Sequence, residues 1–278
     1  RPARFPTLRR TGAGTAAVAH GQWTPGTRPS PGSGSGIDTH GLRLDDLLVL
    51  PVELTLVRAP IDNDGFKLLP LGPGDQWRSL ARWRRQGVLD RPAGELVGHR
   101  VDRQVSPDGR SVTFAHEVDV PDDLADLPRI GVRFALPVRF DRVRWFGRGP
   151  HENYPDRNRS AMLGIWDGPP DPMPYLVPQE YGLRTDVRWL ECHSPATGER
   201  VRIDALHPAS LHMSATHHRA EELFAARNAV DLAEPSELVV HIDLAHRGLG
   251  TASCGPDTLD RYRLGSGLHR FAYRITVA

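Results

Sequence analysis

The chain has 278 residues, which is enough to bury one large hydrophobic core. Its 35 Lys and Arg nearly balance its 34 Asp and Glu, so a net charge of +1 gives no strong field for attracting nucleic acid or an anionic membrane. No run of the sequence approaches the roughly 18 apolar residues of a membrane span. Neutral molecules and other protein surfaces are therefore the expected partners.

Cysteine usage indicates the compartment. The chain has two cysteines, Cys192 and Cys254. A secreted chain of this size often carries more when disulfides hold it together, so we expect a cytoplasmic protein. Arg9-Arg10 could begin a twin-arginine export signal, but residues 11–20 are too weakly apolar for a signal core. Position 1 is Arg rather than Met, which indicates a fragment or a trimmed chain.

The N-terminal region differs in composition from the rest. Residues 21–36 are nearly all Gly, Pro, Ser and Thr, and such a segment cannot offset its ordering entropy by burying apolar surface. We expect a flexible linker or tail over residues 1–36 and one domain over residues 37–278.

Beyond residue 37, short stretches alternate between apolar and polar residues, the period of a strand with one buried face. The clearest is 129–140, where six apolar residues share one face: Ile130, Val132, Phe134, Leu136, Val138 and Phe140. Others, in chain order, are Val52/Leu54/Leu56, Val112/Phe114, Val143/Trp145, Val201/Ile203, Leu238/Val240/Ile242/Leu244 and Phe271/Tyr273/Ile275/Val277. Turn-rich segments at 106–109 and 195–198 separate such runs. The pattern predicts an all-β fold, a large antiparallel β-sandwich.

Two segments have helical rather than strand spacing. In 75–89, Trp77, Leu80 and Trp83 follow a suitable N-cap residue, Asp75. The second segment is 220–227. We expect both to be short helical inserts over a sheet edge.

A Gly/Pro-rich loop over 145–157 gathers charged, amide and aromatic groups directly after a predicted strand. Its candidate residues are His151, Glu152, Asn153 and Arg157. They are either part of a site or a brace, because Asn153, Asp156 and Arg157 are residue types that cap turns and form ion pairs inside large loops.

A second constellation lies in 178–189. Glu180 and Arg184 could bind sugar hydroxyls while Tyr181 or Trp189 stacks on a sugar ring. The alternative is structural: Glu180 and Arg184 would pair with each other across a turn, and Trp189 would belong to the core.

Other chemistries lack a matching pattern. The histidines between 207 and 246 do not have the spacing of a closed zinc-ligand set, so we expect no metal site. No Gly-x-Ser-x-Gly elbow and no phosphate-binding glycine loop occurs. Spacing alone does not identify the two carboxylates, about 5 Å apart, that a retaining glycosidase requires.

Four segments resemble a known family: 58–65 (Arg-Ala-Pro-Ile-Asp-Asn-Asp-Gly), 145–157, 178–189 and 246–257. They are similar, in order, to successive motifs in the C-terminal domain of glycoside hydrolase family 2 β-galactosidases, which some members carry as a separate small subunit. The resemblance spans about residues 37 to 278 and implies a galactose-mutarotase-like supersandwich.

The resemblance also implies a division of labour. In the family, both catalytic glutamates and the Mg and Na sites belong to a TIM barrel encoded upstream, and nothing in this chain resembles that barrel. We therefore expect no catalytic residue and no cofactor here. The expected role is that of an accessory part of an oligomeric enzyme that hydrolyses terminal β-D-galactosides such as lactose, docked on a barrel in the same chain or in a large subunit.

The final loop is where the family domain reaches substrate, through a tryptophan at the mouth of the barrel. Cys254 stands at the matching position. A thiol offers no broad apolar face for stacking, so the resemblance makes Cys254 a candidate at the substrate edge and predicts weaker aglycone affinity.

Two alternatives differ in their predictions. A stand-alone aldose epimerase on the same fold would interconvert galactose anomers without a partner. A carbohydrate-binding module would bind sugar without turnover, with Trp145, Trp189 and Tyr181 lining a groove.

Overall fold

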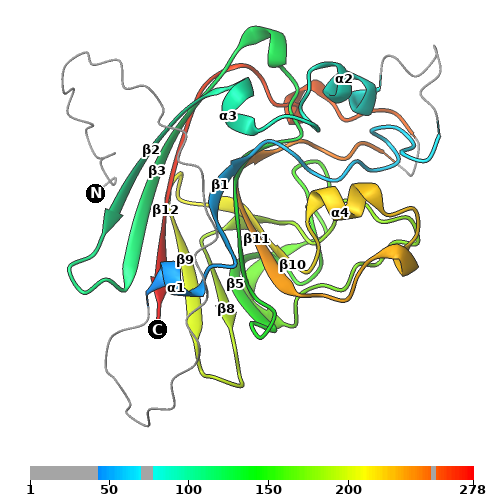
Figure 1. Cartoon of the computed structure of the whole chain (residues 1–278). Helices are drawn as coiled ribbons and strands as arrows, with labels where there is room; N and C mark the ends of the chain where they lie inside the picture. Colours follow the sequence, from blue (N-terminus) through cyan, green and yellow to red (C-terminus); the bar gives the residue numbers. More distant parts are fainter. Residues whose placement is uncertain (1–42, 70–77, 252–254) are drawn as a thin grey trace, which may run out of the picture. The chain divides into compact units, whose positions relative to one another are not determined.

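The computed structural model describes residues 43–69, 78–251 and 255–278, which form two antiparallel β-sheets packed face to face (Figure 1). The predicted large antiparallel β-sandwich is confirmed. The predicted linker over residues 1–36 lies outside the described residues.

One sheet has five strands. Their order is β1 (Leu50–Thr55), β4 (Arg129–Pro137), β11 (Glu237–His246), β10 (Leu211–Thr216) and β7 (Arg184–Val187). Apart from β10 and β11, neighbouring strands of this sheet are not consecutive in the chain.

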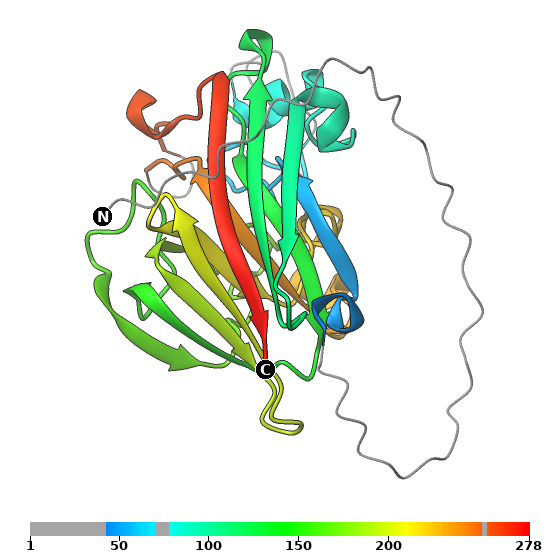
Figure 2. The ribbon, with the colours of Figure 1, turned by 90° about the vertical axis from the view of Figure 1, so that its left-hand side faces the viewer.

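The other sheet has seven strands. Their order is β2 (Gly98–Val105), β3 (Ser111–Val120), β12 (Gly267–Val277), β9 (Arg200–His207), β8 (Trp189–His193), β5 (Arg142–Gly149) and β6 (Met162–Gly168). Figure 2 shows β12, in red, within this sheet between β3 and β9. The turn-rich segments 106–109 and 195–198 join β2 to β3 and β8 to β9, as predicted.

The described helices are short. They are α1 (Leu44–Leu47), α2 (Ser79–Arg85), α3 (Ala93–Leu96) and α4 (Ala220–Ala225), with 3-10 turns η2 (Asp122–Leu124), η3 (Ala229–Asp231) and η4 (Asp260–Tyr262). The helix predicted over 75–89 is present from Ser79 to Arg85, and Asp75 and Trp77 lie outside the described residues. The helix predicted over 220–227 is α4. Within the described residues, no helix has the length and hydropathy needed to cross a membrane.

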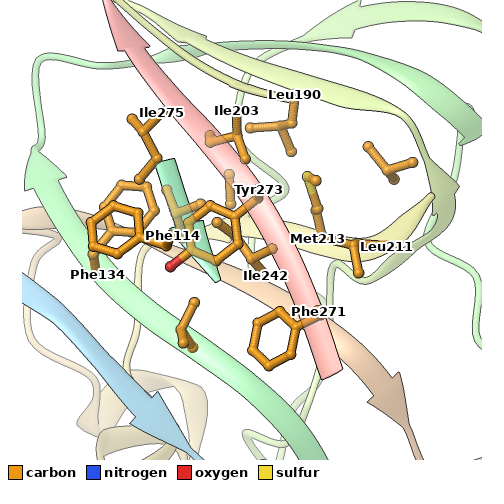
Figure 3. Close-up of a cluster of buried hydrophobic side chains, with 14 of the residues drawn as sticks. Phe114, Phe134, Leu190, Ile203, Leu211, Met213, Ile242, Phe271, Tyr273 and Ile275 are labelled. Carbon is orange, nitrogen blue, oxygen red and sulfur yellow. The ribbon is translucent and has the colours of Figure 1, made fainter. Parts of the chain in front are cut away.

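The core lies between the sheets (Figure 3). Phe134 and Ile242 of the five-stranded sheet and Phe271 and Tyr273 of the seven-stranded sheet are fully buried there. One core prediction was wrong: Val138 is exposed, because β4 ends at Pro137 and the chain turns, with the Phe140 amide donating to the Pro137 carbonyl at 3.0 Å.

Candidate functional site

A pocket of about 270 Å³ lies where the loops after β1, β5 and β11 meet the segment before β7. It is lined by Ile61, Asp62, Asn63, Arg157, Tyr175, Gln179, Glu180, Leu249 and Gly250. All but Tyr175 belong to the four segments singled out in the sequence. Two larger hollows, of about 400 and 410 Å³, contain none of those segments, so the pocket at the convergence of the motifs is the candidate site.

The first wall is held in shape by a buried ion pair. The Arg58 guanidinium donates to both carboxylate oxygens of Asp64, at 2.8 and 2.9 Å, and to the Arg247 carbonyl at 2.9 Å. Asp64 also accepts from the Ile61 amide at 3.0 Å, which fixes the turn carrying Asp62 and Asn63. The wall is therefore rigid before any ligand arrives.

The opposite wall, 247–251, is fastened from two sides. The Asn63 amide donates to the carbonyls of Leu249 and Thr251 at 3.0 and 3.3 Å. The Asp156 carboxylate accepts from the Leu249 amide at 3.0 Å and the Gly250 amide at 2.8 Å. These contacts fix the stem of the loop on which Cys254 stands, while Cys254 itself lies outside the described residues.

Gly250 is required at its position by two constraints. Its φ is +84°, a conformation that other residues rarely adopt, and a Cβ there would lie 2.9 Å from the Pro256 carbonyl oxygen. The close approach of the two ends of the loop therefore depends on glycine.

Glu152 is the hub of the third wall. Its carboxylate accepts from the Tyr175 hydroxyl and the Gly182 amide, both at 2.7 Å, and from Arg157 at 3.0 Å. Burial raises the pKa of Tyr175 to about 12, and the bond to Glu152 adds to the shift, so this hydroxyl stays protonated. His151 is exposed and hydrogen-bonded to Ser160 at 3.0 Å.

Asn153 and Arg184 lie behind this wall rather than in the pocket. Asn153 is fully buried and accepts from the Thr185 amide at 3.0 Å. Arg184 pairs with Asp171 at 2.7 Å, and its guanidinium carbon lies 4.8 Å from the centre of the Trp145 ring. The predicted pairing of Arg184 with Glu180 is therefore not formed.

Glu180 forms the floor of the pocket and is largely buried. It binds Arg129 at 2.7 Å, accepts from the Ala59 amide at 3.3 Å and lies 3.5 Å from Nε2 of His246. Burial alone would raise the pKa of Glu180, but the charge of Arg129 and the bond to His246 hold it well below its usual range. Glu180 is therefore a permanently charged internal ion-pair partner.

The pocket can bind a hydroxylated ligand. Asp62, Arg157, Gln179 and Tyr175 offer acceptors and donors at its surface. Burial raises the pKa of Asp62, although the charge of Lys67 partly opposes the shift. Cleavage of a glycoside requires a second, accessible carboxylate, and both oxygens of Glu180 already bind protein groups. The arrangement favours binding over bond cleavage.

The described residues also show what the site does not contain. Among residues 43–69, 78–251 and 255–278, no three His, Cys, Asp or Glu side chains are grouped so that they could hold a metal ion. The groove suggested for a binding module is not formed, because Trp145 and Tyr181 are buried.

Sequence reasoning singled out the right loops but missed several lining residues. Of the six motif candidates, Arg157 and Glu180 line the pocket, and His151, Glu152, Asn153 and Arg184 do not. Missed were Asp62, Asn63, Tyr175 and Gln179, whereas Asp156, which fixes the loop, acts as the brace that the sequence allowed. All except Tyr175 stand inside the four segments, so each segment as a whole was the available signal.

Comparisons with known proteins agree on one family. The family described as beta galactosidase small chain matches residues 37–277. A β-galactosidase from Arthrobacter sp. (strain B7) is 32% identical over 271 residues, covering 82% of this chain and 26% of that protein. One from Aeromonas hydrophila subsp. hydrophila is 32% identical over 228 residues, covering 69% and 21%. The chain thus spans about a quarter of the length of these relatives.

Solved structures with some likeness are more distant. A putative aldose 1-epimerase from Escherichia coli K12 has a TM-score of 0.34 and 11% identity, covering 65% of this chain and 60% of that one. A galactose mutarotase-like protein from Lactobacillus casei has a TM-score of 0.32 and 12% identity, covering 64% and 62%.

Proposed function

Since this chain belongs to the β-galactosidase small-chain family, we propose that it is the accessory part of an enzyme that hydrolyses terminal β-D-galactosides such as lactose. The catalytic glutamates and the Mg and Na sites would lie in the catalytic part, outside these 278 residues. The observation that carries the proposal is the convergence of four family-like segments on one pocket that has binding groups but no accessible pair of carboxylates.

We assign the docking of the catalytic part to the face beside the pocket. Segments on that face carry the exposed apolar side chains Phe66, Leu68, Leu69, Leu176 and Val230, which we term the apolar rim. Contiguous exposed apolar patches on a protein surface mark interaction sites.

Hydrogen bonds from two donor groups tie together the segments that carry the apolar rim. The Lys67 ammonium donates to the carbonyls of Pro178 and Ala226, at 2.7 and 2.6 Å, and to that of Leu223. The Ala229 amide donates to the Leu176 carbonyl at 2.8 Å. The segment carrying Phe66 to Leu69 is therefore tied to the segments carrying Leu176 and Val230.

In the assembled enzyme, the pocket and the loop of Cys254 would complete the edge of the active site and contact the aglycone. Asp62 and Gln179 would hydrogen-bond its hydroxyls, and Arg157 would orient it. We further propose a cytoplasmic enzyme, supported by the buried, unpaired thiol of Cys192.

A stand-alone epimerase has less support. It would need an accessible histidine and carboxylate, whereas His246 is buried and the oxygens of Glu180, 3.5 Å from it, already bind protein groups.

The test is complementation. This chain and a family 2 catalytic large subunit are assayed separately and mixed, with a chromogenic β-galactoside. We expect hydrolysis in the mixture at a rate far above either component alone. Hydrolysis by this chain alone would overturn the division of labour, and galactose mutarotation by this chain alone would establish the epimerase.

The docking face is tested by two variants. Leu69→Asp and Val230→Asp place charges in the apolar rim and should raise the concentration needed for half-maximal complementation by at least 10-fold. Leu268→Asp is the control, since Leu268 is also exposed but lies on β12, outside the apolar rim. Equal effects from all three variants would contradict the assignment.

A further inference from the structure

Strand β6 is an exposed, apolar edge. It stands last in the strand order of the seven-stranded sheet, and Met162, Leu163 and Ile165 are 68%, 51% and 58% exposed. The strand at the opposite edge, β2, carries Arg100, Asp102 and Arg103, the charges by which proteins discourage edge-to-edge pairing. Among the residues of β6, Asp167 alone is charged, and it is paired with Arg142.

The backbone groups that β6 turns outward follow from the ladder. The Phe146 carbonyl accepts from the Arg188 amide at 2.8 Å, so Phe146 directs its backbone groups toward β8. Since these directions alternate along a strand, Gly147 faces β6, and its partner Gly164 faces β5. The amides and carbonyls of Leu163 and Ile165 therefore point away from the sheet.

These outward groups are self-complementary about Gly164. If a second copy pairs antiparallel with a two-fold axis at Gly164, Leu163 of each copy lies opposite Ile165 of the other, and both present their outward backbone groups. On the other face of the sheet, Met162 lies opposite Trp166, a favourable contact between sulfur and an aromatic ring. Every side-chain pair in this register is apolar.

The neighbouring register is less favourable. Moving the axis to Ile165 would pair all seven residues of β6 but would place Asp167 opposite Leu163 twice. Shifting the register by a single residue would place Leu163 and Ile165 of the two copies on opposite faces of the joined sheet. The sequence of β6 thus favours one arrangement.

We propose that β6 is the contact between two copies of this chain, joined as a continuous antiparallel sheet with Gly164 on the two-fold axis. Five residues per copy form the strand pair, a small contact beside the about 1,600 Å² of a standard interface. The dissociation constant is therefore expected in the micromolar range.

The experiment measures the mass of the full 278-residue chain by sedimentation at rising concentration. The native chain should pass from monomer to dimer, and Ile165→Lys should remain a monomer at concentrations where the native chain is dimeric. The control is Val101→Lys, because Val101 is also an exposed apolar residue and lies on the opposite edge strand β2. Circular dichroism confirms that each variant is folded.

The register is tested separately by cross-linking in a Cys254→Ser background. Leu163→Cys and Ile165→Cys chains should form an intermolecular disulfide when mixed and oxidised, and neither should do so alone. A monomeric native chain at every concentration would overturn the proposal, as would a dimer that Ile165→Lys leaves intact. Impaired complementation by Ile165→Lys, with a monomeric native chain, would instead assign β6 to the catalytic part.

Discussion

The carboxylate of Asp156 holds the backbone amide of Gly250 at 2.8 Å, although 94 residues separate them in the sequence. The same carboxylate binds the Leu249 amide and the Thr258 hydroxyl, so one side chain fixes both ends of the loop that carries Cys254. The position of that loop depends on the segment after β5 as much as on its own residues.

Replacing Asp156 with Asn should loosen this loop. An amide cannot accept from all three donors, so the unfolding free energy should fall by about 1–3 kcal/mol, the cost of an unmade buried hydrogen bond. In the complemented enzyme, kcat/KM should fall about 10-fold, equivalent to about 1.4 kcal/mol. Asp260→Asn is the control, because Asp260 is 93% exposed. Equal losses in both variants would contradict this role.

Gly250→Ala tests the same loop by a different route. The methyl group would lie 2.9 Å from the Pro256 carbonyl oxygen, and the positive φ costs about 1–2 kcal/mol in a residue with a Cβ. We expect a matching loss of stability in urea unfolding and weaker binding of the aglycone, seen as a higher KM. Gly265→Ala should change neither, since a Cβ there meets no atom within 4 Å.

Glu180→Gln should be strongly destabilising. It leaves the buried guanidinium of Arg129 without its closest carboxylate, and breaking a buried pair costs about 3–5 kcal/mol. Because the pKa of Glu180 is lowered in the folded state, its contribution is complete above the ordinary glutamate pKa of about 4.3 and is lost as the pH falls below it. The loss measured in urea should therefore be larger at pH 6 than at pH 4.

The matched change at the surface is Glu95→Gln. Glu95 pairs with Arg91 in an exposed i,i+4 contact, which contributes about 0–1 kcal/mol. A loss from Glu180→Gln no larger than this would show that another carboxylate balances the charge of Arg129. The nearest candidate is Asp243, at 3.4 Å.

Buried histidines should make the fold sensitive to acid. Burial lowers the pKa of His116 to about 3 and that of His246 to about 4. The unfolded chain binds these protons near pH 6.5, so stability should fall as the pH decreases from 6.5 toward 4, by up to about 1.4 kcal/mol per pH unit for each histidine. Asp243 opposes this trend, because burial raises its pKa to about 7. Its contribution to stability decreases as the pH rises from 4 to 7, and therefore increases as the pH falls.

His116→Gln isolates one of these contributions. Glutamine can replace the hydrogen bonds to His99 and Tyr273 but binds no proton in this range. Urea unfolding at several pH values should show a slope smaller by up to about 1.4 kcal/mol per unit between pH 4 and 6.5. An unchanged slope would mean that His116 is not neutral in the folded chain.

The strands were predictable from the sequence because the apolar face of each strand is set by neighbouring residues, of which every second one is apolar. Phe134, Ile242 and Tyr273 are core residues as their alternation indicates. Val138 continues the alternation but is exposed, since the period of two says nothing about where a strand ends.

The site was predictable as loops but not as contacts. Glu180 pairs with Arg129, 51 residues away, and Arg184 with Asp171 rather than with Glu180. Such partners are set by how the two sheets bring distant segments together, which single-sequence patterns do not encode. The burial of Tyr181 was missed because an aromatic residue suits a sugar platform and a core equally well, whereas the alternation of Val143 and Trp145 had already placed Trp145 on a buried strand face.

The place of β12 between β3 and β9 bears on how this protein is synthesised. During translation, β3 and β9 emerge long before the strand that joins them, so neither the seven-stranded sheet nor the core beneath Phe271 and Tyr273 can close until residues 267–277 have left the ribosome. Until then, β3 and β9 lack the strand that pairs with both of them, and chaperones can bind their exposed apolar residues. Deleting residues 267–277 would remove little mass and would prevent the seven-stranded sheet from closing.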